Sequence, residues 1–156
     1  MKNLIALLKK KAAITPKGMM IRGIGYNETR LGGQPIRGSL DRASTEHPIQ
    51  ISHVSGHLSA ANSFLMNING IDENTKDPAG GAFERNPGTN KPDGICKESA
   101  AGYLYNSKKI IYPPKPEQEM AGYRIYFKNV LASGITSIGD ANTSESKSSC
   151  LPETIR

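Results

Sequence analysis

The sequence contains no tryptophan and only two cysteines among its 156 residues. Cys96 and Cys150 lie far apart and form no C-x-x-C pair, which excludes a disulfide-dense secreted scaffold and a compact zinc-binding module. No apolar run approaches the roughly 20 residues of a transmembrane helix. The apolar stretch at residues 4–8 is too short for a secretory signal. We therefore expect a soluble cytoplasmic protein with reduced thiols and no membrane partner.

Clustered charge is also scarce, although 20 Lys and Arg against 14 Asp and Glu give a net charge of +6. A nucleic-acid footprint needs cations gathered on one face. The densest run is Lys9-Lys10-Lys11, at the end of an expected helix, where cations complement the helix dipole. We expect no nucleic-acid partner. A small basic module that binds an anionic partner is the alternative from another functional class.

Glycine and proline are plentiful, with sixteen and ten residues spread along the whole chain, and they predict many short elements. Apolar patterning predicts strands at 19–26, 48–54 and 135–140, and a short strand at 81–84. Helices are expected over 4–12, 59–69, 96–104 and 120–131. Strands that alternate with helices are typical of a parallel α/β fold, which places its sites at the carboxyl ends of the strands.

Two polar residues lie at or just after the ends of expected strands. His57 lies where the second strand gives way to a helix, so it either contacts a ligand or caps that helix. Asp140 ends the last strand and is either a catalytic carboxylate or a helix cap. His53 and His57 have the i, i+4 spacing of zinc ligands on a helix, but Gly56 and the preceding strand disfavour a helix there.

Several segments, in order, resemble the amidohydrolase family 3 enzymes. The matching segments are Pro16 to Glu28, Pro35-Ile36-Arg37-Gly38-Ser39-Leu40-Asp41, Ser55-Gly56-His57 with Asn62-Ser63, Asp77-Pro78-Ala79-Gly80-Gly81 with Glu84-Arg85-Asn86, and Ser133 to Asp140. The departures are Asn27, where an acid is usual, and Asp93, where a threonine is usual. The His-x-His that opens the metal site of the family occurs nowhere in the sequence.

The resemblance implies a hydrolase of amide-like, non-peptide carbon–nitrogen bonds in a (β/α) barrel that holds a divalent metal, with zinc expected. Residues 1–142 would be an internal slice of that barrel with an inserted loop-rich subdomain at about 30–115, followed by an irregular tail at 143–156. The pocket-wall candidates are His57, Asn27, Glu28 and Asp140. Without the His-x-His, we expect this chain alone to bind no metal and to lack activity. Because a slice of a barrel exposes unpaired strand edges and apolar helix faces, we also expect the isolated chain to self-associate. A degenerate gene product without function is a further alternative.

Overall fold

The computed structural model describes residues 1–105 and 116–139. The chain divides into two units, Met1–Ile111 and Tyr112–Arg156. The first unit contains a five-stranded sheet with helices. In the second unit the structure describes α5, Pro116–Ala132, and the residues that follow it to Gly139. The fold is therefore mixed α/β, as the sequence predicted.

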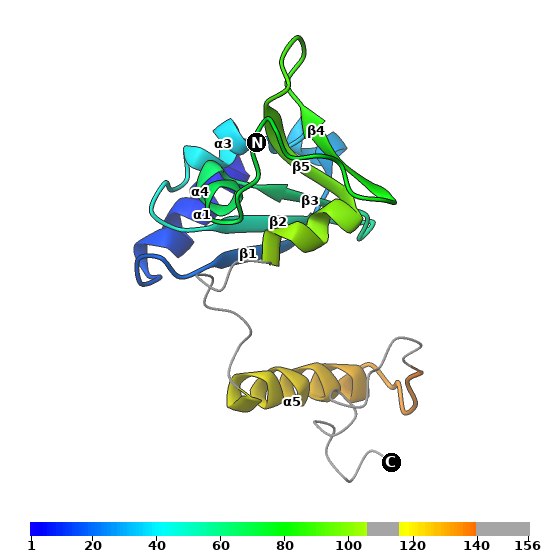
Figure 1. Ribbon diagram of the computed structural model, residues 1–156. Helices are drawn as coiled ribbons and strands as arrows, with labels where there is room; N and C mark the ends of the chain where they lie inside the picture. The colour runs from blue at the N-terminus through cyan, green and yellow to red at the C-terminus, as the bar shows by residue number, and fades with distance from the viewer. Residues whose placement is uncertain (106–115, 140–156) are drawn as a thin grey trace. The chain divides into compact units, whose positions relative to one another are not determined.

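The sheet has the strand order β1-β2-β3-β5-β4 (Figure 1). Its strands are β1 (Ile21–Tyr26), β2 (Ile49–His53), β3 (Leu58–Ala61), β4 (Gly81–Arg85) and β5 (Pro92–Glu98). Only β1 and β2 pair in parallel, with Ile21 opposite Ile49. The other three pairs are antiparallel. The expectation of a parallel sheet is thus correct for one pair of strands and wrong for the rest of the described sheet.

Short helices connect the strands. The first unit contains α1 (Lys2–Ala13), α2 (Glu28–Leu31), α3 (Arg37–Asp41), α4 (Ser63–Ile68) and a 3₁₀ helix at Ser99–Tyr105. Glycine is required in β1, where the register shifts between Ile24 and Tyr26 and Gly25 has φ = 80°. This bulge bends the end of β1 just before α2, because an unpaired extra residue interrupts the ladder.

The core lies on both faces of the sheet because neighbouring residues of a strand point to opposite faces. Ala60 belongs to one buried cluster, with Leu8 of α1, Leu40 of α3 and Ile51 of β2. The next residue, Ala61, belongs to the other cluster, which includes side chains of α4, β4, β5 and the 3₁₀ helix. The Leu4, Leu8 and Ala12 face of α1 packs onto the first cluster, as its apolar spacing predicted.

Two predicted helices begin later than expected, at Ser63 and Ser99, and one predicted strand does not form. Residues 58–61 form β3 instead of the start of a helix, and residues 92–98 form β5 where a helix was expected from Cys96. Both segments are apolar enough for either state, and hydrogen bonding to neighbouring strands decided between them. Residues 135–139 form no strand, and Ile135 and Ile138 remain about half exposed.

Candidate functional site

Glu28 and His53 meet at the carboxyl ends of the two parallel strands. His53 is the last residue of β2, and Glu28 begins α2 two residues after β1 ends at Tyr26. Because β1 and β2 run in the same direction, their carboxyl ends share one edge of the sheet. His53 Nε2 lies 2.6 Å from Glu28 Oε2. The histidine side chain is 10% exposed and the carboxylate 41%, so the pair is open to solvent on the carboxylate side.

The second ring nitrogen of His53 is also engaged. His53 Nδ1 lies 2.7 Å from Ser55 Oγ, and the Ser55 amide donates to Nδ1 at 3.1 Å. An ionised carboxylate only accepts hydrogen bonds, so we infer that Nε2 carries the proton and Nδ1 accepts. The ring of Tyr26 packs edge-on against the imidazole, with centroids 5.0 Å apart. The histidine is therefore held on three sides in one orientation and one tautomer.

The electrostatics of this corner follow from its hydrogen bonds and burial. A backbone hydrogen bond and, next, the hydrogen bond from His53 hold the pKa of Glu28 below its ordinary value. Burial raises the pKa of Tyr26 to about 12, and the Glu28 charge adds to that rise. The Tyr26 hydroxyl donates to Gln34 Oε1 at 2.9 Å. At neutral pH the corner thus combines an ionised carboxylate with a neutral phenol.

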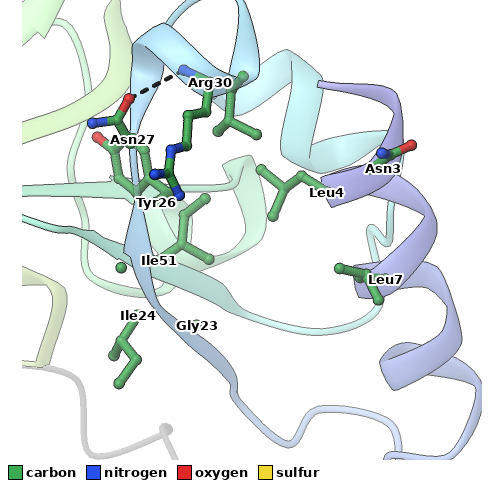
Figure 2. Close-up of a pocket in the computed structure, with 11 residues that line it drawn as sticks. Asn3, Leu4, Leu7, Gly23, Ile24, Tyr26, Asn27, Arg30 and Ile51 are labelled. Carbon is green, nitrogen blue, oxygen red and sulfur yellow. Dashed lines mark hydrogen bonds between the residues drawn. The ribbon is translucent and has the colours of Figure 1, made fainter.

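Asn27 has a structural role in addition to its position beside Glu28. Its side-chain oxygen accepts a hydrogen bond from the Arg30 amide at 3.1 Å and so caps α2 (Figure 2). Asn27 also borders a hollow of about 310 Å³ between α1, β1 and α2. Most of the surface that lines the hollow is apolar, and the side chains of Leu4, Leu7 and Ile24 contribute to it (Figure 2).

His57 lies in the turn between β2 and β3, so the expectation of a strand-to-helix junction is wrong at this point. The helix-capping alternative fails for the same reason. The His57 ring is 68% exposed, and its Nδ1 lies 3.0 Å from the carboxylate of Glu98. Its amide donates to Ser55 Oγ at 3.2 Å. Ser55 thus hydrogen-bonds both His57 and His53, but the two histidine rings pair with different carboxylates.

Sequence reasoning missed His53 and Glu98 as members of this region. His53 was considered only as half of a metal pair with His57, although its place at the end of a strand beside Glu28 was a usable signal. Glu98 follows from no local pattern, because it reaches His57 only through the antiparallel pairing of β3 with β5. Asp140 lies outside the described residues.

Two aspartates in the segments that resemble the family, Asp41 and Asp77, form local hydrogen bonds. Asp41 accepts hydrogen bonds from the amide and the hydroxyl of Ser63, at 2.8 and 2.7 Å, and thereby holds the start of α4. Asp77 accepts from the Phe83 amide at 3.0 Å and from Arg85 at 3.4 Å, which closes the loop before β4. Both carboxylates therefore stabilise the local fold.

The described residues do not fit a metal ion. No group of three or more His, Cys, Asp or Glu side chains in residues 1–105 and 116–139 could hold one. The Glu28–His53 pair supplies only two such groups, and both nitrogens of the imidazole already have hydrogen-bond partners. A nitrogen engaged in this way offers no free lone pair to a cation.

Within the part of the chain that the structure describes, none of the helices has the length and apolar character needed to cross a bilayer.

The chain is similar in sequence to known proteins that are longer than it is. The N-substituted formamide deformylase of Arthrobacter pascens is 29% identical over 89% of this chain and 26% of its own length. The protein LONG AFTER FAR-RED 3 of Arabidopsis thaliana is 30% identical over 86% of this chain and 22% of its length. The chain thus spans about a quarter of the curated relatives that it matches.

Two crystal structures share the fold, both of uncharacterized metal-dependent hydrolases. The protein from Pyrococcus furiosus aligns with a TM-score of 0.57 at 21% identity, over 96% of this chain and 28% of its own. The protein from Pyrococcus horikoshii OT3 aligns with the same TM-score at 19% identity. That alignment covers 96% of this chain and 27% of the Pyrococcus horikoshii chain. A sequence model of the amidohydrolase family matches residues 1–154. The chain therefore belongs to the amidohydrolase family.

Proposed function

We propose that this chain is an internal segment of a metal-dependent hydrolase that cleaves amide-like, non-peptide carbon–nitrogen bonds, and that it forms part of the substrate pocket wall. The observation that carries the proposal is the Glu28–His53 pair at the carboxyl ends of two adjacent parallel strands. Enzymes built on (β/α) barrels place their ligand-contacting side chains at this end of the strands. Family membership supplies the reaction class.

The proposed architecture is a barrel segment over residues 1–142 with a subdomain inserted at about 30–115. The antiparallel strands β3, β4 and β5 all fall within that range and support an insertion, because a (β/α) barrel contains only parallel strands. β2 lies in the same range and pairs in parallel with β1, so it would join the insertion to the barrel. The irregular tail proposed for 143–156 lies outside the described residues.

The proposed role of the Glu28–His53 pair is to orient substrate. The ionised carboxylate fixes the imidazole, and its exposed side can accept a hydrogen bond from a substrate N–H group. His57, with its exposed ring, and Asn27, at the rim of the hollow, are further proposed wall residues. Asp140 is another. A divalent metal, with zinc expected, would be bound by the whole enzyme through groups other than the described residues.

The DNA that flanks the coding sequence tests the segment assignment. An in-frame sequence upstream that encodes a His-x-His would support it, and in-frame stop codons directly on both sides would contradict it. The 156-residue chain alone should hold no stoichiometric zinc and hydrolyse no amide. One tightly held metal ion per chain, lost in the His53→Gln, His57→Gln double variant, would contradict the proposal.

The pocket-wall role is tested in the full-length protein with an N-substituted formamide as substrate. Glu28→Gln and His53→Gln should each lower kcat/KM by about tenfold or more, equivalent to at least ~1.4 kcal/mol. Glu46→Gln is the matched control, because Glu46 forms an ion pair of the same 2.6 Å length with Lys17 at an exposed site. If kcat/KM falls equally in all three variants, or does not fall in Glu28→Gln and His53→Gln, the Glu28–His53 pair is not part of the substrate pocket.

A further inference from the structure

The outer face of α1 and the end of α3 border a second, open hollow of about 330 Å³. It is lined by Lys2, Ile5, Ala6, Lys9 and Arg42. Lys2 and Lys9 are seven residues apart, which places them on one face of the helix about 10.5 Å apart along its axis. The small side chain of Ala6 lies between them. The face that packs on the sheet, with Leu4 and Leu8, points about 130° away around the helix axis.

All the charge around this hollow is positive. No carboxylate lines it, and none of its three cations forms an ion pair within the described residues. Lys17 and Arg85, by contrast, form ion pairs with Glu46 and Asp77. Three uncompensated cations around one concavity repel one another, and a bound anion would relieve that repulsion.

Helix stability does not explain Lys2. The amino end of a helix favours negative charge, yet the first turn of α1 has no acidic residue and carries Lys2. Lys10 and Lys11, in the last turn, complement the dipole in the ordinary way. The placement of Lys2 is thus unfavourable for the helix and favourable for an anion in the hollow.

We propose that Lys2, Lys9 and Arg42 form a binding site for the phosphate groups of a small anionic ligand, of the phosphate monoester or diphosphate class. The Arg42 guanidinium can contact two phosphate oxygens at once, and the two lysines act as point charges on either side. Ile5 and Ala6 offer an apolar floor for the remainder of the ligand. This site is separate from the Glu28–His53 corner and does not depend on the proposed hydrolase function.

The test is isothermal titration of the 156-residue chain with inorganic pyrophosphate at low ionic strength. The triple variant Lys2→Gln, Lys9→Gln, Arg42→Gln should weaken binding by about tenfold or more, because charge-assisted hydrogen bonds are lost. The control Lys10→Gln, Lys76→Gln, Lys91→Gln removes the same charge at exposed positions that do not line the hollow. It should change the affinity by less than about twofold. Circular dichroism verifies that both variants keep the fold.

Two additional ligands identify the source of the phosphate. Vesicles with and without phosphatidic acid test whether the ligand is a lipid headgroup, and a phosphorylated sugar tests whether it is a free metabolite. The ligand that binds should bind more weakly to the Lys2, Lys9, Arg42 triple variant, as pyrophosphate does. Equal weakening of pyrophosphate binding by the two triple variants would show a diffuse charge effect and overturn the proposal. So would the absence of pyrophosphate binding, or binding of a single-stranded oligonucleotide alone.

Discussion

The side-chain oxygen of Asn62 accepts a hydrogen bond from the Ile49 amide at 3.0 Å, which links the turn before α4 to the first residue of β2. The same oxygen accepts from the Leu65 amide, also at 3.0 Å, and caps α4. The Asn62 nitrogen donates to the carbonyls of Ser44 and His47. Because the residue is completely buried, these four hydrogen bonds replace all contact with water and hold three segments in register.

Replacing Asn62 with alanine should therefore destabilise the fold strongly. Asn62→Ala leaves two buried amides and two carbonyls without partners, and we expect a loss of about 3 kcal/mol in the free energy of unfolding. The control is Asn67→Ala, at an exposed position of α4, with an expected change within about 0.5 kcal/mol. Urea unfolding followed by circular dichroism measures both. Equal midpoints for the two variants would show that the hydrogen bonds of Asn62 contribute little.

Acid should weaken the fold in part through Glu28. Its pKa is lower in the folded chain than its ordinary value of 4.5, so the unfolded chain takes up the proton first as the pH falls. The contribution is fully present above pH 4.5 and is lost as the pH falls through the folded pKa. Glu28→Gln should therefore make the unfolding free energy fall less steeply as the pH drops below about 4.5. The control is Glu73→Gln, because Glu73 is exposed and has no ion pair among the described residues; it should leave the slope of unfolding free energy against pH unchanged. Identical slopes in the wild type and in Glu28→Gln would contradict the expectation for Glu28.

The Cys96 thiol should be inert in the folded protein. It is completely buried between β3 and β4, and burial raises its pKa to about 12. Few thiolates therefore exist at neutral pH, and reagent cannot reach them. In a Cys150→Ser background, Ellman's reagent at about pH 8 should label no thiol until urea unfolds the chain. Rapid labelling without denaturant would place Cys96 outside the core.

Self-association of the chain should depend on β1. β1 is an edge strand of the described sheet, and its Ile24 is 85% exposed. Exposed edges with apolar side chains pair readily with other chains, and a charge on the edge discourages such pairing. Ile24→Lys should therefore reduce the self-associated fraction in sedimentation velocity experiments. The control Ile14→Lys adds the same charge at a position 77% exposed beyond the end of α1. A similar decrease in both variants would attribute the effect to net charge.

Elements with a strong local signal were predicted well. The apolar spacing of residues 4–12 gave α1, and the β-branched runs gave β1 and β2 close to their observed bounds. These patterns hold because one face of each element must be buried, and the period of apolar residues records which face that is. The segment at 135–139 had a similar run but forms no strand, because a strand needs a hydrogen-bonded neighbour that local sequence does not supply.

The sequence by itself determined the family and the mixed α/β class, since these depend on residue order and local periodicity. Only the tertiary structure decided that residues 58–61 and 92–98 are strands, that Glu28 pairs with His53, and that His57 pairs with Glu98. Each of these depends on segments 25 or more residues apart, or on pairing between strands. Such contacts are selected by hydrogen bonding and burial across the whole sheet, so no local pattern records them.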